Sequence, residues 1–174
     1  LQTIARRQLE PYGSVRVADV AVTDVRSQDG AGFVATLADG STQAVRYVLL
    51  ATGVYDDLPR IDGLERLWGH SVFVCPYCDA WEMRDKPLAA YGRGRGGFEL
   101  ARLLLGWSSD IVICSDGPAS LSAAERSFLE SKDLRLIETP VERFESDGTA
   151  LAAMAFSDGT ALPRTAAFIR APLR

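Results

Sequence analysis

Two cysteines separated by two residues form the part of this sequence best suited to chemistry. Cys75 and Cys78 enclose Pro76 and Tyr77, and Asp79 follows at once. Such a pair is a redox dithiol or half of a metal site. Where the second cysteine lies in the start of a helix, backbone N–H groups and the helix dipole stabilise a thiolate, so one sulfur can attack a disulfide and the other can resolve it. We interpret the pair as a redox-active dithiol that gives and accepts electrons near a nucleotide cofactor.

A structural zinc half-site and two buried cysteines of no special role are the alternatives to a dithiol. Zinc would need two more ligands, and the remaining conventional candidates are Cys114, inside an apolar strand, and the single histidine, His70. We therefore predict no metal site, with Cys114 in the core and His70 in a loop. The string Cys-Pro-Tyr-Cys also occurs in glutaredoxins, which carry it near the start of the chain before a long helix, whereas Pro87 here ends any helix early.

A glycine-rich turn follows the cysteine pair. Gly92, Gly94 and Gly97 satisfy the pattern G-x-G-x-x-G between an apolar run, Pro87 to Tyr91, and an expected helix, Phe98 to Gly106. In that context the first glycine permits a tight turn, the second lets the backbone approach a pyrophosphate, and the third lets the helix pack on the strand. We predict that this turn binds a dinucleotide; a flexible turn without a ligand is the alternative.

Charged residues around the glycine turn bear on which nucleotide it would take. Arg93 and Arg95 lie within the turn and would either reach a phosphate or be solvated. Asp116 follows Gly97 at about the spacing of an acid that accepts hydrogen bonds from a ribose 2′-hydroxyl. Because a carboxylate repels a 2′-phosphate, Asp116 favours NADH over NADPH, unless Asp116-Gly117 is only a turn.

The elements that must position these residues form a β-glycine turn-α-β unit. The apolar run Asp110 to Cys114 completes the unit that Pro87 to Tyr91 begins, and such units build a parallel sheet with a right-handed crossover. Ser122 and Glu125 predict a capping box at the start of a helix, before a strand from Leu134 to Ile137. The expected fold class is α/β: a Rossmann-like three-layer nucleotide-binding domain, with a parallel sheet plus a β-meander and a partial second domain.

An earlier part of the chain predicts a helix and three strands. Leu1 to Tyr12 has the pattern of the end of an amphipathic helix. The strand-like runs are Val15 to Val25, Phe33 to Leu37 and Ala44 to Leu50, with turns at Asp29-Gly30 and Asp39-Gly40. The last run leads into Ala51, Thr52 and Gly53, a small-residue turn where the backbone can approach a ligand closely.

A second set of strands echoes the first. A shift of 119 residues places Asp39-Gly40 on Asp158-Gly159 and Leu49-Leu50 on Phe168-Ile169 without a gap. Two copies of one nucleotide-binding unit would produce this echo, and so would chance in short β-meanders. A loop-like passage after Gly53 marks a domain boundary. Since no methionine opens the chain, we expect a piece of a longer protein.

Composition argues against several classes of function. Of the 174 residues, 47% are hydrophobic and 24% charged, as in ordinary soluble globular proteins. The formal net charge of -4 and the pI near 5.1 argue against nucleic acid or an anionic membrane surface as the partner. No apolar run approaches the roughly 20 residues that span a bilayer. Three cysteines are too few for a secreted disulfide scaffold, so a cytoplasmic setting is expected.

Several of these features occur in the order found in one family of flavoproteins. They are Ala51-Thr52-Gly53 after a strand, Cys75-x-x-Cys78-Asp79 with Trp81-Glu82 after it, the glycine turn with Glu99, and the final strand Ala167-Phe168-Ile169. In this the chain resembles the thioredoxin reductase-like branch of the FAD-dependent pyridine nucleotide-disulfide oxidoreductases. The resemblance implies a nicotinamide domain, carrying the dithiol, inserted into an FAD domain. Residues 1–67 would be a partial FAD-binding domain and residues 68–174 the NAD(P)-binding domain.

The resemblance also implies cofactors, partners and roles. FAD and NAD(P)H would be the cofactors, with the Ala51-Thr52-Gly53 turn on the FAD side. Cys78 would face the flavin, Cys75 would exchange with the substrate, and Asp79 would move a proton or only favour the helix dipole. The substrate would be a thioredoxin-like protein or a small-molecule disulfide or dithiol, and the full-length protein would be a homodimer.

Two departures from that family bear on the electron path. NADPH-dependent thioredoxin reductases carry basic residues after the second strand, where this chain has Ser115-Asp116-Gly117. The string Cys-Pro-Tyr-Cys is closer to related dithiol oxidases, which form disulfides in small sulfur-containing metabolites and pass electrons from flavin to oxygen. We expect a disulfide oxidoreductase that passes electrons from NAD(P)H through FAD to Cys75 and Cys78 and on to a disulfide. A dithiol oxidase and a non-catalytic nucleotide- or zinc-binding module are the alternatives.

Overall fold

The computed structural model divides the chain into two compact units, Leu1–Gly53 and Val54–Arg174, and describes residues 2–28, 30 and 32–171. The loop-like passage after Gly53 predicted a boundary at the place where the two compact units divide, whereas the family resemblance placed the domain boundary between residues 67 and 68. The compact units part earlier because α2 (Leu64–Leu67) buries both Leu64 and Leu67 in the core of the second unit. The assignment of residues 1–67 to an FAD domain stays a prediction. No helix among the described residues is long and apolar enough to cross a membrane.

The first unit holds a helix and a three-stranded antiparallel sheet of order β1-β2-β3. Its elements are α1 (Gln2–Leu9), β1 (Val22–Gln28), β2 (Gly32–Leu37) and β3 (Thr42–Val45). The predicted Asp39-Gly40 turn joins β2 to β3: Gly40 has a φ of 83°, and the Asp39 carboxylate accepts hydrogen bonds from the backbone N–H and hydroxyl of Ser41. Asp29 of the other predicted turn lies outside the described residues.

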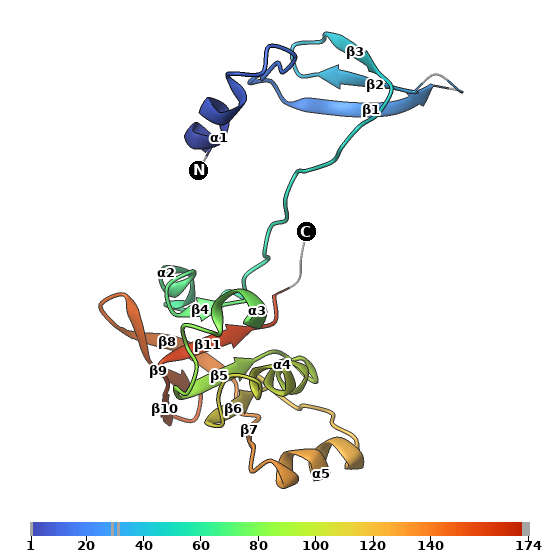
Figure 1. Ribbon diagram of the computed structural model, residues 1–174. Coiled ribbons are helices and arrows are strands. Elements are labelled where there is room, and N and C mark those ends of the chain that lie inside the picture. The colour runs from blue at the N-terminus through green and yellow to red at the C-terminus, as the bar shows by residue number, and fades with distance from the viewer. Residues whose placement is uncertain (1, 29, 31, 172–174) are drawn as a thin grey trace. The chain divides into compact units, whose positions relative to one another are not determined.

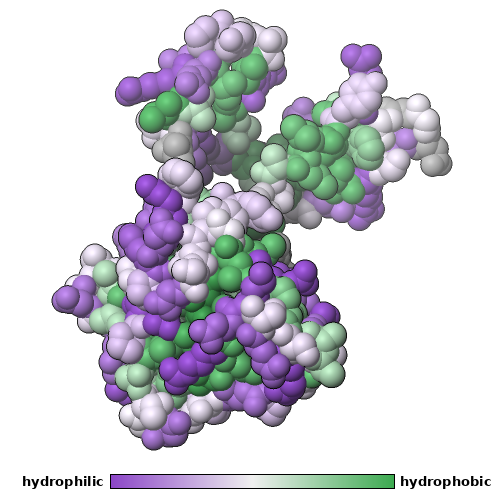
Figure 2. Space-filling model, turned by 60° about the horizontal axis from the view of Figure 1, so that its bottom comes forward, coloured by the Kyte–Doolittle hydropathy of each residue, from purple (hydrophilic) through white to green (hydrophobic). Residues whose placement is uncertain are grey.

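Two strands of this unit are shorter than the sequence predicted. The run from Val15 forms a strand only from Val22, and the strand in the run to Leu50 ends at Val45. Leu49 and Leu50, expected in a buried strand, are 90% and 76% exposed. A strand requires a neighbour for its backbone groups, and no strand of the described chain pairs with residues 46–50. The small sheet also leaves apolar side chains on its surface (Figure 2).

The second unit is built on a five-stranded parallel sheet of order β4-β11-β5-β6-β7 (Figure 1). Its strands are β4 (Val72–Phe73), β5 (Leu88–Tyr91), β6 (Ile111–Cys114), β7 (Arg135–Ile137) and β11 (Ala166–Ile169). The predicted unit is present: β5 enters the glycine turn, α4 (Gly96–Leu104) follows, and β6 pairs with β5 in parallel. The fully buried β5, β6 and β11 read as continuous apolar runs because both faces of the sheet are covered.

Two layers cover the sheet. Phe98 and Leu100 of α4 and Leu129 of α5 (Ala123–Ser131) pack on one face in one hydrophobic cluster. The antiparallel meander β8 (Val141–Asp147), β9 (Ala150–Phe156) and β10 (Ala161–Pro163) covers the other, where Phe144 and Met154 belong to a second cluster. The remaining helix, α3 (Pro76–Asp79), carries the cysteine pair. This is the three-layer Rossmann-like α/β fold predicted from the sequence.

The meanders of the two units repeat one another in register. The shift of 119 residues converts the bounds of β1, Val22–Gln28, into those of β8, Val141–Asp147. Val22 opposes Leu37 just as Val141 opposes Phe156, and both first strands carry an irregularity immediately after these residues. Because the register and the bulge are reproduced, the internal repeat reflects two copies of one structural unit.

Candidate active site

Cys75 and Cys78 are brought together by a single helical turn. Cys75 is the N-cap of α3 in extended conformation, and its carbonyl accepts hydrogen bonds from the N–H groups of Cys78, at 3.1 Å, and Asp79, at 3.2 Å. Pro76 occupies the first helical turn, where its missing N–H costs nothing. Both cysteines are free thiols, with Cys75 half-buried and Cys78 exposed. The helix ends after Asp79, unlike the long helix of a glutaredoxin.

The environment of the pair keeps a proton on Cys78. A hydrogen bond with Cys75 raises the pKa of Cys78, and partial burial and the charges of Cys75 and Asp79 act in the same direction. Cys78 therefore keeps its proton to higher pH than an ordinary thiol. Burial raises the pKa of Asp79, and the charge of Glu82 raises it further. A carboxyl group that stays protonated to higher pH is suited to donate a proton beside a reacting thiol.

Aromatic side chains flank the accessible dithiol. Tyr77, between the two cysteines, is 75% exposed and meets Trp107 edge-on, with 5.3 Å between ring centroids. Trp81 is also exposed, and the Arg84 guanidinium lies 4.3 Å from the centre of its ring. Sequence reasoning missed Trp107, because it lies far along the chain from the pair and nothing in its local pattern indicates the contact.

The glycine turn has the geometry that its pattern predicts. A Cβ added to Gly92 would lie 2.8 Å from the backbone of Gly96 and Gly97, so only glycine permits this turn. A Cβ on Gly97 would lie 3.0 Å from Ile113 and 3.1 Å from the carbonyl of Ala90, so Gly97 allows α4 to pack on the sheet. Gly94 has a φ of 56° and open space around it. The cradle therefore fits a nicotinamide dinucleotide, whose binding stays a prediction.

Asp116 ties the loop after β6 to its surroundings. Its carboxylate is nearly buried, with 7% of the side chain exposed, and accepts hydrogen bonds from the Tyr91 hydroxyl, the Arg93 Nε and the Val141 N–H. Burial alone would raise the pKa of Asp116, but these donors lower it below its ordinary value. A carboxylate has about four acceptor positions. Three of these acceptor positions are used within the protein. A hydrogen bond from a ribose 2′-hydroxyl to Asp116 stays a prediction.

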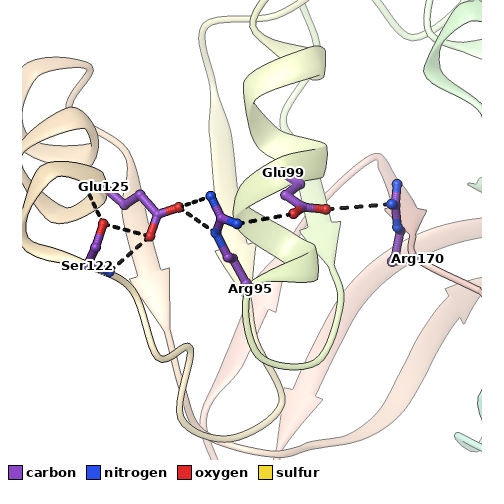
Figure 3. Close-up of polar contacts among 5 residues, drawn as sticks. All are labelled: Arg95, Glu99, Ser122, Glu125 and Arg170. Carbon is purple, nitrogen blue, oxygen red and sulfur yellow. Dashed lines mark hydrogen bonds and ion pairs between the residues drawn. The ribbon is translucent and has the colours of Figure 1, made fainter.

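An alternating chain of charges runs beside the glycine turn (Figure 3). Arg95 pairs with Glu125 and, at 3.8 Å, with Glu99; Glu99 in turn lies 3.5 Å from Arg170. Glu125 also completes the predicted capping box with Ser122 at the start of α5. Of the two arginines inside the turn, Arg93 is bonded to Asp116 and Arg95 to Glu125, so both hold the turn in place.

A cavity of about 570 Å³ opens next to the glycine turn. It is lined by residues 57–61, by Tyr91 at the end of β5, by Arg93, and by Arg170 just after β11. Ligands of open α/β sheets bind at the carboxyl ends of neighbouring strands, which is where this cavity lies. The cysteine pair does not line it.

The other predicted site residues lie elsewhere. Ala51, Thr52 and Gly53 belong to the first unit, are exposed, and have extended or irregular backbone with a φ of 72° at Gly53. Their expected contact with FAD stays a prediction.

Cys114 is fully buried in β6, and burial raises its pKa to about 12, as expected of an inert core thiol. Among the described residues, no group of three histidine, cysteine or acidic side chains could hold a metal ion.

No family model matches the chain, but individual proteins do. A probable thioredoxin reductase of Arthroderma benhamiae is 34% identical over 118 residues, which are 65% of this chain and 29% of the relative. Thioredoxin reductase aclD of Aspergillus oryzae is 28% identical over 166 residues, which are 90% of this chain and 52% of the relative. The chain thus spans about half or less of the length of these curated relatives.

Solved structures match the chain more completely. A putative thioredoxin reductase TrxB of Bacillus anthracis covers 99% of this chain with a TM-score of 0.84 at 28% identity, and the match takes in 58% of that structure. The structure of HlmI covers 98% with a TM-score of 0.86, also at 28% identity, and 54% of that structure is matched. The resemblance and the fold class predicted from the sequence are confirmed.

Proposed function

Because proteins named thioredoxin reductase match nearly this whole chain, we propose that the full-length protein is a flavin-dependent disulfide oxidoreductase whose exchanging groups are Cys75 and Cys78. Electrons pass from NAD(P)H through FAD to this pair and on to a disulfide of a thioredoxin-like protein or a small molecule. The observation that carries the proposal is the geometry of α3, where one helical turn brings two free thiols together next to a carboxyl group of raised pKa.

The exchange begins at Cys75, the partner that hydrogen-bonds to the protonated Cys78. The Cys75 thiolate attacks one sulfur of the substrate, the substrate S–S bond breaks, and a mixed disulfide forms. The leaving thiolate takes a proton from Asp79. Cys78 then gives its proton to Asp79 and attacks Cys75, so the second substrate thiolate leaves and the Cys75–Cys78 disulfide forms. The substrate gains two electrons, and the dithiol loses them.

FAD, when bound, would supply the electron pair that restores the dithiol. In the first unit, the exposed Ala51-Thr52-Gly53 turn supports a place for it, since small residues and a left-handed Gly53 leave the backbone open to a ligand. The predicted homodimer and cytoplasmic location stay predictions.

The nucleotide proposed as donor is NADH rather than NADPH. Both arginines inside the glycine turn already face a carboxylate: Asp116 for Arg93 and Glu125 for Arg95. A 2′-phosphate would add two negative charges beside these acids and find cations that are already neutralised. A dinucleotide without that phosphate is the better match.

One observation supports the reverse direction as a second candidate. Asp116 has three donors inside the protein, so a nicotinamide dinucleotide gains less from it than from an uncommitted acid. In that direction a substrate dithiol reduces the Cys75–Cys78 disulfide, and the electrons leave through the flavin to oxygen.

Anaerobic absorbance spectra of the full-length protein separate the two directions. Bleaching of the flavin by NADH, with a weaker response to NADPH, is the result that the proposal predicts. If neither nucleotide bleaches the flavin but a small dithiol does, the reductase direction is wrong and the oxidase direction stands.

A further inference from the structure

Arg170 is one position at which the second copy of the structural repeat differs from the first. The 119-residue shift that superposes the meanders places Ala51 of the small-residue turn on Arg170. Both residues directly follow the apolar run that ends the copy. Where the first copy has a methyl group, the second therefore has a long cation.

The backbone of β11 fixes where this cation starts. The Arg170 N–H donates a hydrogen bond to the Tyr91 carbonyl at 2.8 Å, which extends the pairing of β11 with β5 to the carboxyl ends of both strands. The Arg170 Cβ lies 3.0 Å from the position of a Cβ added to Gly92, and its Cγ lies 3.4 Å from one added to Gly96. The aliphatic part of Arg170 thus lies against the glycine turn.

Among Arg93, Arg95 and Arg170, the guanidinium of Arg170 has the weakest pairing with an acid. Its ion pair, with Glu99, spans 3.5 Å. By contrast, Arg93 is bonded at 2.8 Å to the nearly buried Asp116, and Arg95 is bonded closely to Glu125. Arg170 can therefore change its partner without undoing the turn.

The same side chain lines the cavity beside the glycine turn. Arg60 and Arg93 line that cavity too, so cations from three separate segments face one space of about 570 Å³. Arginine forms paired, charge-assisted hydrogen bonds with phosphate oxygens, and Glu99 offers it only a loose exposed contact. Three arginines and one acid, Asp57, line the cavity, so its lining favours an anion that approaches the glycine turn.

We propose that Arg170 leaves Glu99 and binds the pyrophosphate of a dinucleotide lying on the glycine turn, which makes it a ligand-positioning residue. The inference rests on the proposed function, because it takes the dinucleotide to be the electron donor. It adds the prediction that Glu99 competes with the nucleotide for the same guanidinium.

Equilibrium binding to the full-length protein tests the proposal by calorimetry, with NADH, ADP-ribose and inorganic pyrophosphate as separate probes. Arg170→Ala should weaken binding of NADH and of ADP-ribose by about 10- to 100-fold, the usual effect of removing a charged hydrogen-bond donor. Glu99→Gln should tighten both a few-fold by removing the competitor. Arg102→Gln removes the same charge from α4, but on the side of Phe98 and Phe128, and should leave both affinities unchanged.

Several results would overturn the proposal. If Arg170→Ala binds NADH as tightly as the wild type, or more tightly, the side chain only fills the space above the turn. If the wild type binds neither NADH nor ADP-ribose, or binds inorganic pyrophosphate alone, the ligand of this site is not a dinucleotide. Anaerobic bleaching of the flavin by NADH is measured in parallel: if the wild type binds NADH but its flavin is not bleached, the proposed function is wrong while the affinities still test the role of Arg170.

Discussion

The hydroxyl of Tyr91 donates a hydrogen bond of 3.0 Å to the carboxylate of Asp116, joining the end of β5 to the loop after β6. Arg93 of the glycine turn and the N–H of Val141 at the start of β8 converge on the same carboxylate. Asp116 therefore links the glycine turn, the parallel sheet and the meander, whether or not it also binds a nucleotide.

Asp116→Asn should destabilise the protein by about 1–3 kcal/mol, the usual cost of leaving buried donors without their charged acceptor. Urea unfolding measures the loss, and Asp147→Asn, an exposed substitution at the end of β8, should be nearly neutral. A change of equal size in the two variants would contradict the structural role of Asp116.

The stability that Asp116 contributes should depend on pH in a defined direction. Its pKa is lowered in the folded state, so its contribution is present above the unfolded pKa of about 3.9 and is lost as the pH falls through the lower folded value. The difference in unfolding free energy between wild type and Asp116→Asn should shrink below about pH 4. A difference that grew on acidification would show the opposite sign of the pKa shift.

The two cysteines should behave differently when each is replaced. Cys78→Ser should accumulate a mixed disulfide between Cys75 and a small disulfide substrate, because the resolving thiol is gone. Cys75→Ser should accumulate much less, and Cys114→Ala should exchange as the wild type does, since Cys114 is buried. Mass spectrometry of the intact protein reads these adducts. An adduct trapped mainly on Cys78 would reverse the assigned roles.

Asp79→Asn should slow exchange by about 10²- to 10⁴-fold, as loss of a general acid does. In the wild type the rate should fall on the alkaline side as Asp79 loses its proton, and the raised pKa of Asp79 moves this fall to higher pH. Glu82→Gln removes a charge that raises that pKa, so it should move the fall to lower pH without abolishing exchange. Stopped-flow rates across a pH series give both profiles; identical profiles for wild type and Asp79→Asn would exclude the proton-transfer role.

Gly92→Ala should destabilise the second unit by more than about 1 kcal/mol, because its added Cβ would lie 2.8 Å from backbone atoms. Gly106→Ala offers a matched control at the end of α4, where the added Cβ would make an ordinary contact of 3.5 Å. Thermal unfolding compares them, and equal melting temperatures would contradict the tight turn.

The fold of the second unit was predictable because the sequence patterns that indicate its elements are local. Buried strands such as Ile111 to Cys114, the capping box at Ser122 and the glycine turn each bring together residues that are close in sequence. The first unit was harder, because Leu49 and Leu50 have the pattern of a buried strand, which forms only beside another strand. A periodic pattern shows what a segment can do, not whether the chain supplies its neighbour.

The site was predictable in its residue types and not in its contacts. Spacing identified the cysteine pair, the three glycines and Asp116. The three donors on Asp116, the ring contact of Tyr77 with Trp107 and the position of Arg170 against the glycine turn arise from residues far apart in sequence. Nothing in the local sequence around Arg170 indicates its place against the glycine turn.

The central claim is that Cys75 and Cys78 cycle between dithiol and disulfide, with NADH as the electron donor that restores the dithiol. It is tested by adding one equivalent of NADH anaerobically to the oxidised full-length protein, quenching with an alkylating reagent and locating the label by mass spectrometry. The account predicts that both Cys75 and Cys78 become labelled after NADH and that neither is labelled before it. Labelling that is the same with and without NADH would contradict it.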